Sequence, residues 1–117
     1  MLRGKKLDLV VSSLRMDCVA ASALGIGRSK LKNYVASRNV YVNKQAISKA
    51  ALEVNEGDEI DLTRSKEDDK VALSRFKVLT IDKDQTKKAK RRLSGIRYGS
   101  MTISRVDFDE NYTQPED

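Results

Sequence analysis

The chain opens with a short apolar run followed by an alanine-rich stretch. Residues 7–13, LDLVVSS, predict a strand, and residues 14–24, LRMDCVAASAL, predict a first helix. Ser13 can accept hydrogen bonds from backbone N–H groups at the helix start. Gly25 follows the last helical residue, where a left-handed conformation commonly ends a helix. These signals predict a strand and then a helix in the first quarter of the chain.

A second helix is predicted directly after Gly27. Leu31, Tyr34 and Val35 fall at positions i, i+3 and i+4, so they share one face of this helix and are expected to point into the core. The other side chains of GRSKLKNYVAS are mostly polar or basic and make up its outer side. Asn39 is expected to close the helix, because asparagine tolerates the left-handed conformation needed there.

After the second helix the pattern alternates with a period of two, which is typical of strands. Strands are expected at residues 40–43, 56–62, 70–81 and 95–108. Gly57 can supply the positive φ of a tight turn at the start of the second of these. In the third, the alternation changes phase near Ser74 and Arg75, which predicts a β-bulge there.

These elements predict one compact α+β domain in which two short N-terminal helices pack on an antiparallel sheet. A chain of 117 residues is large enough to bury one core but not to divide into two. Residues 1–84 are expected to form the main unit with its preceding strand, and residues 85–108 a basic β-hairpin that extends the same domain. Residues 109–117 are expected to be a disordered acidic tail.

Charge is segregated along the chain, whose formal net charge is +6. Residues 1–50 carry ten Lys or Arg against two acids, and residues 87–105 carry seven basic residues and no acid. Residues 51–86 and 106–117 are acidic overall. Basic blocks of this kind are expected of a protein that binds a polyanion.

Composition excludes several kinds of site. Cys18 is the single cysteine, so no internal disulfide forms, and without histidine no zinc site of Cys and His can be assembled. Cys18 is expected to be a small core residue, because a cysteine nucleophile needs a base such as histidine. No apolar run approaches the roughly 20 residues of a membrane span, and MLRGKK leads into a strand rather than a signal segment. We expect no catalytic set, no metal and no cofactor, in a soluble chain of a reducing compartment.

The start of the second predicted helix gathers groups that bind phosphate. Arg28, Ser29 and Lys30 coincide with free backbone N–H groups and with the positive end of the helix dipole. Lys32 and Asn33 extend this surface by one turn. Phosphate contacts are expected to dominate here, with little reading of base sequence.

Further candidates flank this helix. Arg38 and Lys44 lie toward its far end, and Asn43 can offer donors and acceptors to a base edge or a 2′-hydroxyl. Tyr41 alternates outward, and both stacking on a base and a purely structural role remain open. The run KKAKRR forms either a solvated turn or a second RNA contact. The candidates in that run are Lys88, Lys90, Arg91 and Arg92.

Four linked motifs between residues 13 and 63 resemble the S4-like (alpha-L) RNA-binding domain family in order and spacing. The family pattern is R-x-D in the first helix, G-[IV]-[SG]-R-[SN]-K opening the second, a V-x-V-N strand and a V-x-x-G-D-x-[IL] strand. The corresponding segments here are SLRMD, GIGRSKLKNYVASRNVYVN and LEVNEGDEIDL. Within that family, the chain is most similar to the mitochondrial transcription rescue factors and next to bacterial ribosome-quality-control S4 proteins.

The resemblance implies that residues at matching positions face RNA. These residues are Arg15, Arg28, Ser29, Lys30, Lys32, Asn33, Arg38, Asn43 and Lys44. Asp17, the acid of the R-x-D motif, is expected to orient Arg15, because a carboxylate and a phosphate repel each other. Two positions depart from the family pattern: Asn39 stands where glycine is usual, and Gly27 stands where many relatives have a capping serine.

The resemblance also implies a non-catalytic protein that binds structured RNA, with large-subunit rRNA and tRNA of the mitochondrial ribosome as partners. The implied process is mitochondrial ribosome rescue, translation quality control or gene expression, with a peptide-release rescue factor as a further partner. The expected location is the mitochondrial matrix, or the bacterial cytoplasm as the alternative, and the expected state is a monomer. An accessory RNA-binding module of an RNA-modifying enzyme such as a pseudouridine synthase is the second interpretation. A protein-interaction module would expose an apolar patch rather than clustered cations.

Overall fold

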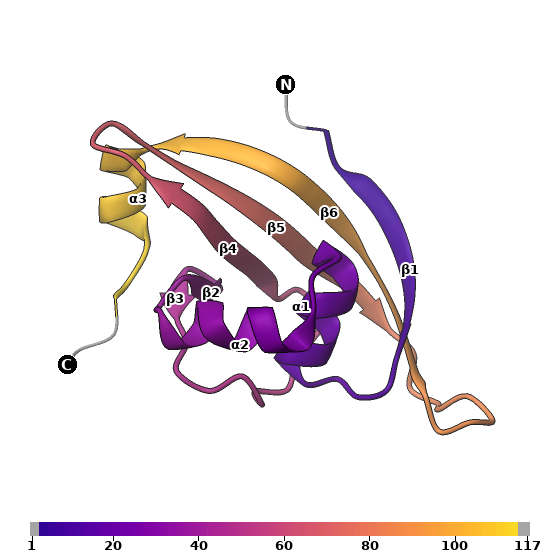
Figure 1. The fold of residues 1–117 in the computed structure, drawn as a ribbon. Helices are drawn as coiled ribbons and strands as arrows, with labels where there is room; N and C mark the ends of the chain where they lie inside the picture. Colours follow the sequence, from indigo (N-terminus) through magenta and orange to yellow (C-terminus); the bar gives the residue numbers. More distant parts are fainter. Residues whose placement is uncertain (1–2, 115–117) are drawn as a thin grey trace.

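The computed structural model of the protein describes residues 3–114, which form one antiparallel sheet and three helices (Figure 1). The elements are β1 (Lys5–Val11), α1 (Met16–Leu24), α2 (Arg28–Ala36), β2 (Val40–Val42), β3 (Gln45–Ala46), β4 (Glu59–Lys66), β5 (Lys70–Ile81), β6 (Arg91–Ser104) and α3 (Arg105–Asn111). The six strands lie in the order β1-β6-β5-β4-β2-β3, and each neighbouring pair is antiparallel. The predicted α+β class is thereby confirmed. None of the helices described between residues 3 and 114 is long and apolar enough to cross a membrane.

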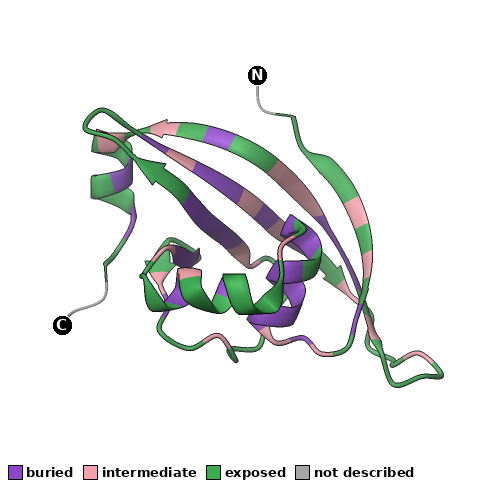
Figure 2. Cartoon of the chain, viewed as in Figure 1, coloured by how far each residue is buried: buried purple, intermediate pink, exposed green. Residues whose placement is uncertain are grey.

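The two N-terminal helices pack on one face of the sheet, as predicted (Figure 1). α1 buries every residue except Ser22, and its small and aliphatic side chains form the middle of the main core. α2 buries only Leu31 and Val35, so most of its surface faces solvent (Figure 2). α1 therefore acts as a structural element, whereas α2 presents its polar and basic side chains outward.

The ends of these helices follow the sequence signals in part. Gly25 ends α1 in the left-handed conformation (φ 69°), as predicted. Ser13 does not cap the helix, because α1 begins after Arg15 and Ser13 Oγ accepts the Arg15 N–H instead, at 3.1 Å. The left-handed residue after α2 is Arg38 (φ 62°), so the expectation that Asn39 takes this conformation is wrong by one position. The N–H groups of both residues donate back into the last turn of α2, which fixes this geometry.

β5 and β6 form a long hairpin at the centre of the sheet. The bulge predicted near Ser74 and Arg75 is present, because the register of β5 against β6 shifts between Leu73 and Arg75. The basic run begins in the turn that joins the two strands, at the lower right of Figure 1, and its two arginines are the first residues of β6. The first strand of the hairpin is β5, so the hairpin begins well before the expected boundary, which falls inside the turn.

The other face of the sheet carries a second, smaller core that α3 covers. Ser104 caps α3 by accepting a backbone N–H at 3.0 Å, and Phe108 and Tyr112 pack onto the sheet with 2% and 6% of their surface exposed. The expectation of disorder from residue 109 onward is therefore wrong for residues 109–114, and residues 115–117 lie outside the described part of the chain. The acidic composition of this segment predicts solvation, but its aromatic side is buried.

Tyr41 belongs to this second core. It is fully buried, and its ring centroid lies 5.6 Å from that of Phe108 and 5.2 Å from that of Tyr112. The alternation of Tyr41 away from the main core is as predicted, but α3 covers that face, so stacking of Tyr41 on a base is excluded in this conformation. Burial and the neighbouring Asp61 carboxylate raise the pKa of Tyr112, whose hydroxyl donates to Asp61 at 2.5 Å beside the Asp61–Arg75 ion pair. This network ties the C-terminal segment to the sheet.

Candidate nucleic-acid interface

Asp17 joins two arginines from neighbouring helices. Its side chain is fully buried, and its two oxygens accept hydrogen bonds from Arg15 Nε and Nη2, both at 3.1 Å. Arg28 Nη2, from the first residue of α2, donates to the same carboxylate at 3.3 Å. Both arginine side chains remain about half exposed, at 43% and 50%. The carboxylate thus orients Arg15, as expected, and also fixes Arg28 beside it.

The electrostatics of this cluster favour ionised Asp17. Burial on its own raises the pKa of the Asp17 carboxyl, but hydrogen bonds and charge from Arg15 and Arg28 outweigh burial and lower that pKa below its usual value. One buried negative charge therefore orients two half-exposed positive charges. The guanidinium N–H groups that do not bond to Asp17 are left for an anion outside the protein.

Replacing Asp17 with Asn is expected to lower the free energy of unfolding at pH 7 by about 1–3 kcal/mol, because charge-assisted hydrogen bonds are lost. The folded-state pKa of Asp17 is lowered, so its stabilisation is complete above the unfolded pKa of about 3.9 and is lost as pH falls through the folded value. Urea unfolding at a series of pH values measures this. The difference in free energy of unfolding between wild type and Asp17→Asn should disappear in acid. The control is Asp8→Asn, which changes an exposed aspartate. A difference in free energy of unfolding that stayed constant with pH would contradict the lowered pKa of Asp17.

The predicted residues on α2 share the outer side of the helix. Ser29, Lys30, Lys32 and Asn33 are all exposed, and Arg38 is exposed in the turn that follows. Leu31 and Val35 are the buried residues of this helix, so most of its surface faces solvent (Figure 2). The structure therefore brings these side chains together with Arg28 on one element.

The basic hairpin turn approaches the start of α2. A hollow of about 330 Å³ lies between the end of β1 and α1, and both Arg28 and Lys90 line it. Cys18 lines its inner wall as a buried thiol that accepts a weak hydrogen bond from Ser12 Oγ at 3.8 Å, in keeping with its expected structural role. Two predicted cations that are 62 positions apart in sequence therefore face one concave surface.

The four basic candidates of the hairpin point in different directions. Lys88 and Lys90 are exposed in the turn, which Thr86 braces by accepting the Lys90 N–H at 3.0 Å. Arg91 is half-buried and donates to the Asp82 carbonyl at 3.2 Å. Arg92 is exposed but lines a separate hollow together with residues of β1 and β5. Of the four, only Lys90 lines the hollow that Arg28 also lines.

Asn43 and Lys44 form the tight turn between β2 and β3, both with positive φ (53° and 67°). The Asn43 amide donates to Asp58 at 2.9 Å and accepts the Glu59 N–H at 3.0 Å, so part of its hydrogen-bonding capacity is used within the fold. Lys44 Nζ lies 3.7 Å from the Glu59 carboxylate and 6.0 Å from the centre of the Tyr112 ring. Both residues thus contact acidic side chains of the same protein, and their contact with RNA stays a prediction.

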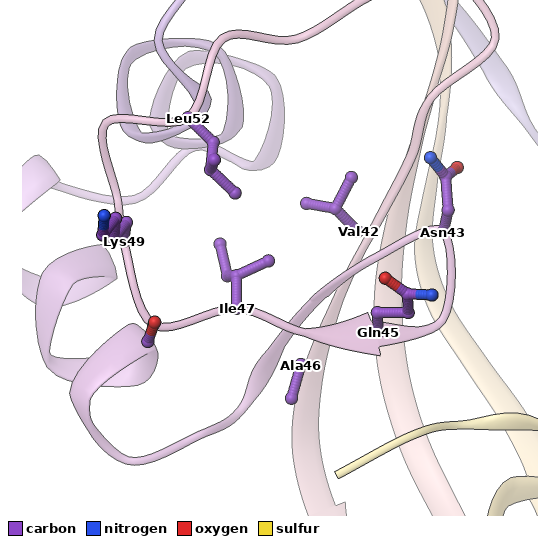
Figure 3. Close-up of a pocket in the computed structure, with 8 residues that line it drawn as sticks. Val42, Asn43, Gln45, Ala46, Ile47, Lys49 and Leu52 are labelled. Carbon is purple, nitrogen blue, oxygen red and sulfur yellow. The ribbon is translucent and has the colours of Figure 1, made fainter. Parts of the chain in front are cut away.

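A hollow of about 510 Å³ lies beside this turn (Figure 3). Val42, Ile47 and Leu52 point toward one another across it, with Lys49 at one side and Asn43 at the other (Figure 3). An apolar floor with a single cation does not suit a phosphate chain. Among residues 3–114, no group of three or more His, Cys, Asp or Glu side chains is placed to hold a metal ion.

Sequence reasoning missed Arg64, an exposed residue of β4 whose guanidinium lies 5.8 Å from the centre of the Tyr34 ring. The strand is expected from its pattern to end at Leu62, whereas it continues to Lys66. The contact joins residues 30 positions apart, so no local spacing could have indicated it.

Comparison with protein families gives a match to a family described as mitochondrial transcription rescue factor 1, C-terminal domain, over residues 5–105. Comparison with individual curated proteins gave no match. The matched region runs from the first residue of β1 to the first residue of α3, so it includes Asp17 with its two arginines, all of α2 and the hairpin turn. With most of its length matched, the chain belongs to the family of mitochondrial transcription rescue factor 1 C-terminal domains.

Proposed function

We propose that the protein is a non-catalytic RNA-binding protein that recognises structured RNA by shape and by phosphate contacts. The observation that carries the proposal is the Asp17 cluster, which fixes Arg15 and Arg28 beside the exposed basic side of α2. Guanidinium groups held by a carboxylate lose little entropy when they bind a phosphate. The resemblance of residues 13–63 to S4-like domains supports the same surface.

The family name associates the protein with mitochondria and with transcription rescue. We assign it to the mitochondrial matrix, acting in mitochondrial gene expression, with large-subunit rRNA and tRNA as its RNA partners in ribosome rescue or translation quality control. A peptide-release rescue factor is the protein partner that this role requires, and the domain binds RNA as a monomer. These assignments rest on the family and on the S4-like motifs, which occur in proteins that contact ribosomal RNA.

The hairpin turn adds a second contact to the same RNA. Lys90 lines one hollow together with Arg28, so a phosphate chain that leaves the α2 surface can meet the turn lysines next. Thr86 Oγ1 accepts the Lys90 N–H, and this hydrogen bond fixes the backbone of the turn that carries the lysines. The two basic regions then act as a clamp on RNA.

Replacing Lys88 and Lys90 with Gln tests this clamp. Each lost phosphate contact is expected to lower the slope of log affinity against log salt by roughly 0.7–0.9, so the pair should lower it by about 1.5. The measurement is the affinity for a structured RNA at several salt concentrations. A matched control replaces Lys5 and Lys49, which are exposed elsewhere, and should leave the slope unchanged. Equal slopes in all three proteins would limit the RNA surface to α1 and α2.

A further inference from the structure

A groove runs along the outer side of α2 toward the end of β4. Lys30 and Asn33 line its first part, a hollow of about 300 Å³, and Arg64 and Lys66 line its second part, a hollow of about 280 Å³. Tyr34 and Asn39 line both hollows, so the two lie next to each other. We call this surface, from Lys30 to Lys66, the α2–β4 groove.

In the middle of the groove, the guanidinium of Arg64 lies beside the ring of Tyr34. The Arg64 guanidinium carbon lies 5.8 Å from the Tyr34 ring centroid, within the range of a cation–π contact. Arg64 Nε donates to Ser74 Oγ at 3.1 Å, and Ser74 in turn donates to the Gly99 carbonyl at 2.7 Å. The guanidinium is therefore held from the sheet side, although Arg64 itself is exposed. A planar group held in this way is suited to stack on a nucleobase.

The surroundings of the platform match a nucleotide chain. Lys30 lies toward one end of the groove, whereas the Lys66 ammonium is turned away toward the Tyr41 hydroxyl, at 3.5 Å, and the Phe108 ring, at 5.3 Å from its centre. No acidic residue within residues 3–114 lines either hollow. Asn39 accepts a hydrogen bond from Thr63 Oγ1 at 2.7 Å, which leaves its amide nitrogen to donate to a base carbonyl. A cation beside a group that can stack on a base is a combination that suits single-stranded nucleic acid.

We propose that the α2–β4 groove holds an unpaired RNA segment next to the structured RNA, with one base stacked on the Tyr34–Arg64 platform. A phosphate next to that base lies at Lys30. The base must be unpaired, because a paired base has both faces covered within its helix. This inference rests on the proposed function and adds a substrate class to it, namely a junction between a helix and a single strand.

The test compares a short blunt RNA duplex with the same duplex carrying an unpaired extension that contains a fluorescent adenine analogue. Wild type is expected to bind the extended RNA about tenfold more tightly, the effect of one base stacked on a side-chain platform. Binding should also quench the analogue. Tyr34→Leu and Arg64→Gln should each lose this preference and the quenching, while binding the blunt duplex nearly as well as wild type. Lys49→Gln removes one exposed cation outside the groove and should keep both.

The outcomes separate this inference from the proposed function. Equal affinity of the wild type for both RNAs would overturn the groove assignment while leaving RNA binding intact. Failure to bind either RNA would overturn both. Tyr34 packs partly against the main core, so Tyr34→Leu is first checked by thermal unfolding. Arg64→Gln changes an exposed side chain and carries the test alone if the tyrosine variant does not fold.

Discussion

Charge reversal of Lys30 and Lys32 to Glu is expected to weaken binding to structured RNA by at least about a hundredfold at physiological salt. Both side chains are exposed on the outer side of α2, and each reversal replaces a phosphate contact with repulsion, which costs several kcal/mol when like charges are placed together. Stability should change little, because exposed substitutions usually stay within about 0.5 kcal/mol. Fluorescence anisotropy and thermal unfolding measure the two effects.

The choice of residues follows from the structure. Arg28 remains unchanged, because a glutamate there would lie beside the buried Asp17 carboxylate and would destabilise the fold as well as the interface. A variant with Lys5 and Lys49 changed to Glu has the same net charge and controls for long-range attraction. If the two double variants bound RNA equally well, the outer side of α2 would not be the interface.

Replacement of Phe108 with Ala is expected to lower the free energy of unfolding by about 3–5 kcal/mol, the usual cost of removing a buried aromatic ring. Phe108 is 2% exposed and lies on the rings of Tyr41 and Tyr112, so its loss leaves a cavity in the smaller core. Denaturant unfolding provides the measurement. Val106, on the same helix but 64% exposed, gives the matched control, and Val106→Ala should cost less than about 0.5 kcal/mol.

Equal, small effects of these two substitutions would mean that α3 does not cover the sheet in solution. RNA affinity below the unfolding temperature provides a second check. Phe108→Ala should leave it nearly unchanged, because the second core is separate from the main core on which α1 and α2 pack.

Local periodicity was sufficient to predict the two N-terminal helices and most strands. Spacing of i, i+3 and i+4 in α2 identified its buried side, and the change of phase near Ser74 located the bulge in β5. Both signals depend on neighbours in sequence. The α+β class and the solvent-facing side of α2 could therefore be derived from the sequence alone.

α3 was missed because its charge obscured its pattern. Phe108 and Tyr112 are four residues apart, and Ser104 stands three residues before an aspartate, which is a capping signal. The strand predicted over residues 95–108 took in the first half of this helix, although β6 ends at Ser104, and the acids that follow suggested a disordered tail. The error extended to Tyr41, whose outward alternation was correct but whose face is covered by this helix.

The residues of the candidate site were predictable from the sequence, but the contacts between them were not. The R-x-D motif identified Arg15 and Asp17, but the bond from Arg28 to the same carboxylate joins two helices and needed the tertiary structure. The same holds for the approach of Lys90 to Arg28 and of Arg64 to Tyr34. Sequence identified the cations, and packing decided which of them act together.

Ultraviolet crosslinking of the protein to its RNA, followed by mass spectrometry of the crosslinked peptides, tests the RNA interface most directly. Crosslinks are expected on peptides from residues 15–33 and from the turn at residues 86–90, within the same RNA complex. Sequencing the bound RNA from cells is expected to give large-subunit rRNA or tRNA of mitochondria. Absence of any RNA crosslink, or crosslinks confined to α3 and the β2–β3 turn, would contradict an RNA interface built on α1, α2 and the hairpin turn.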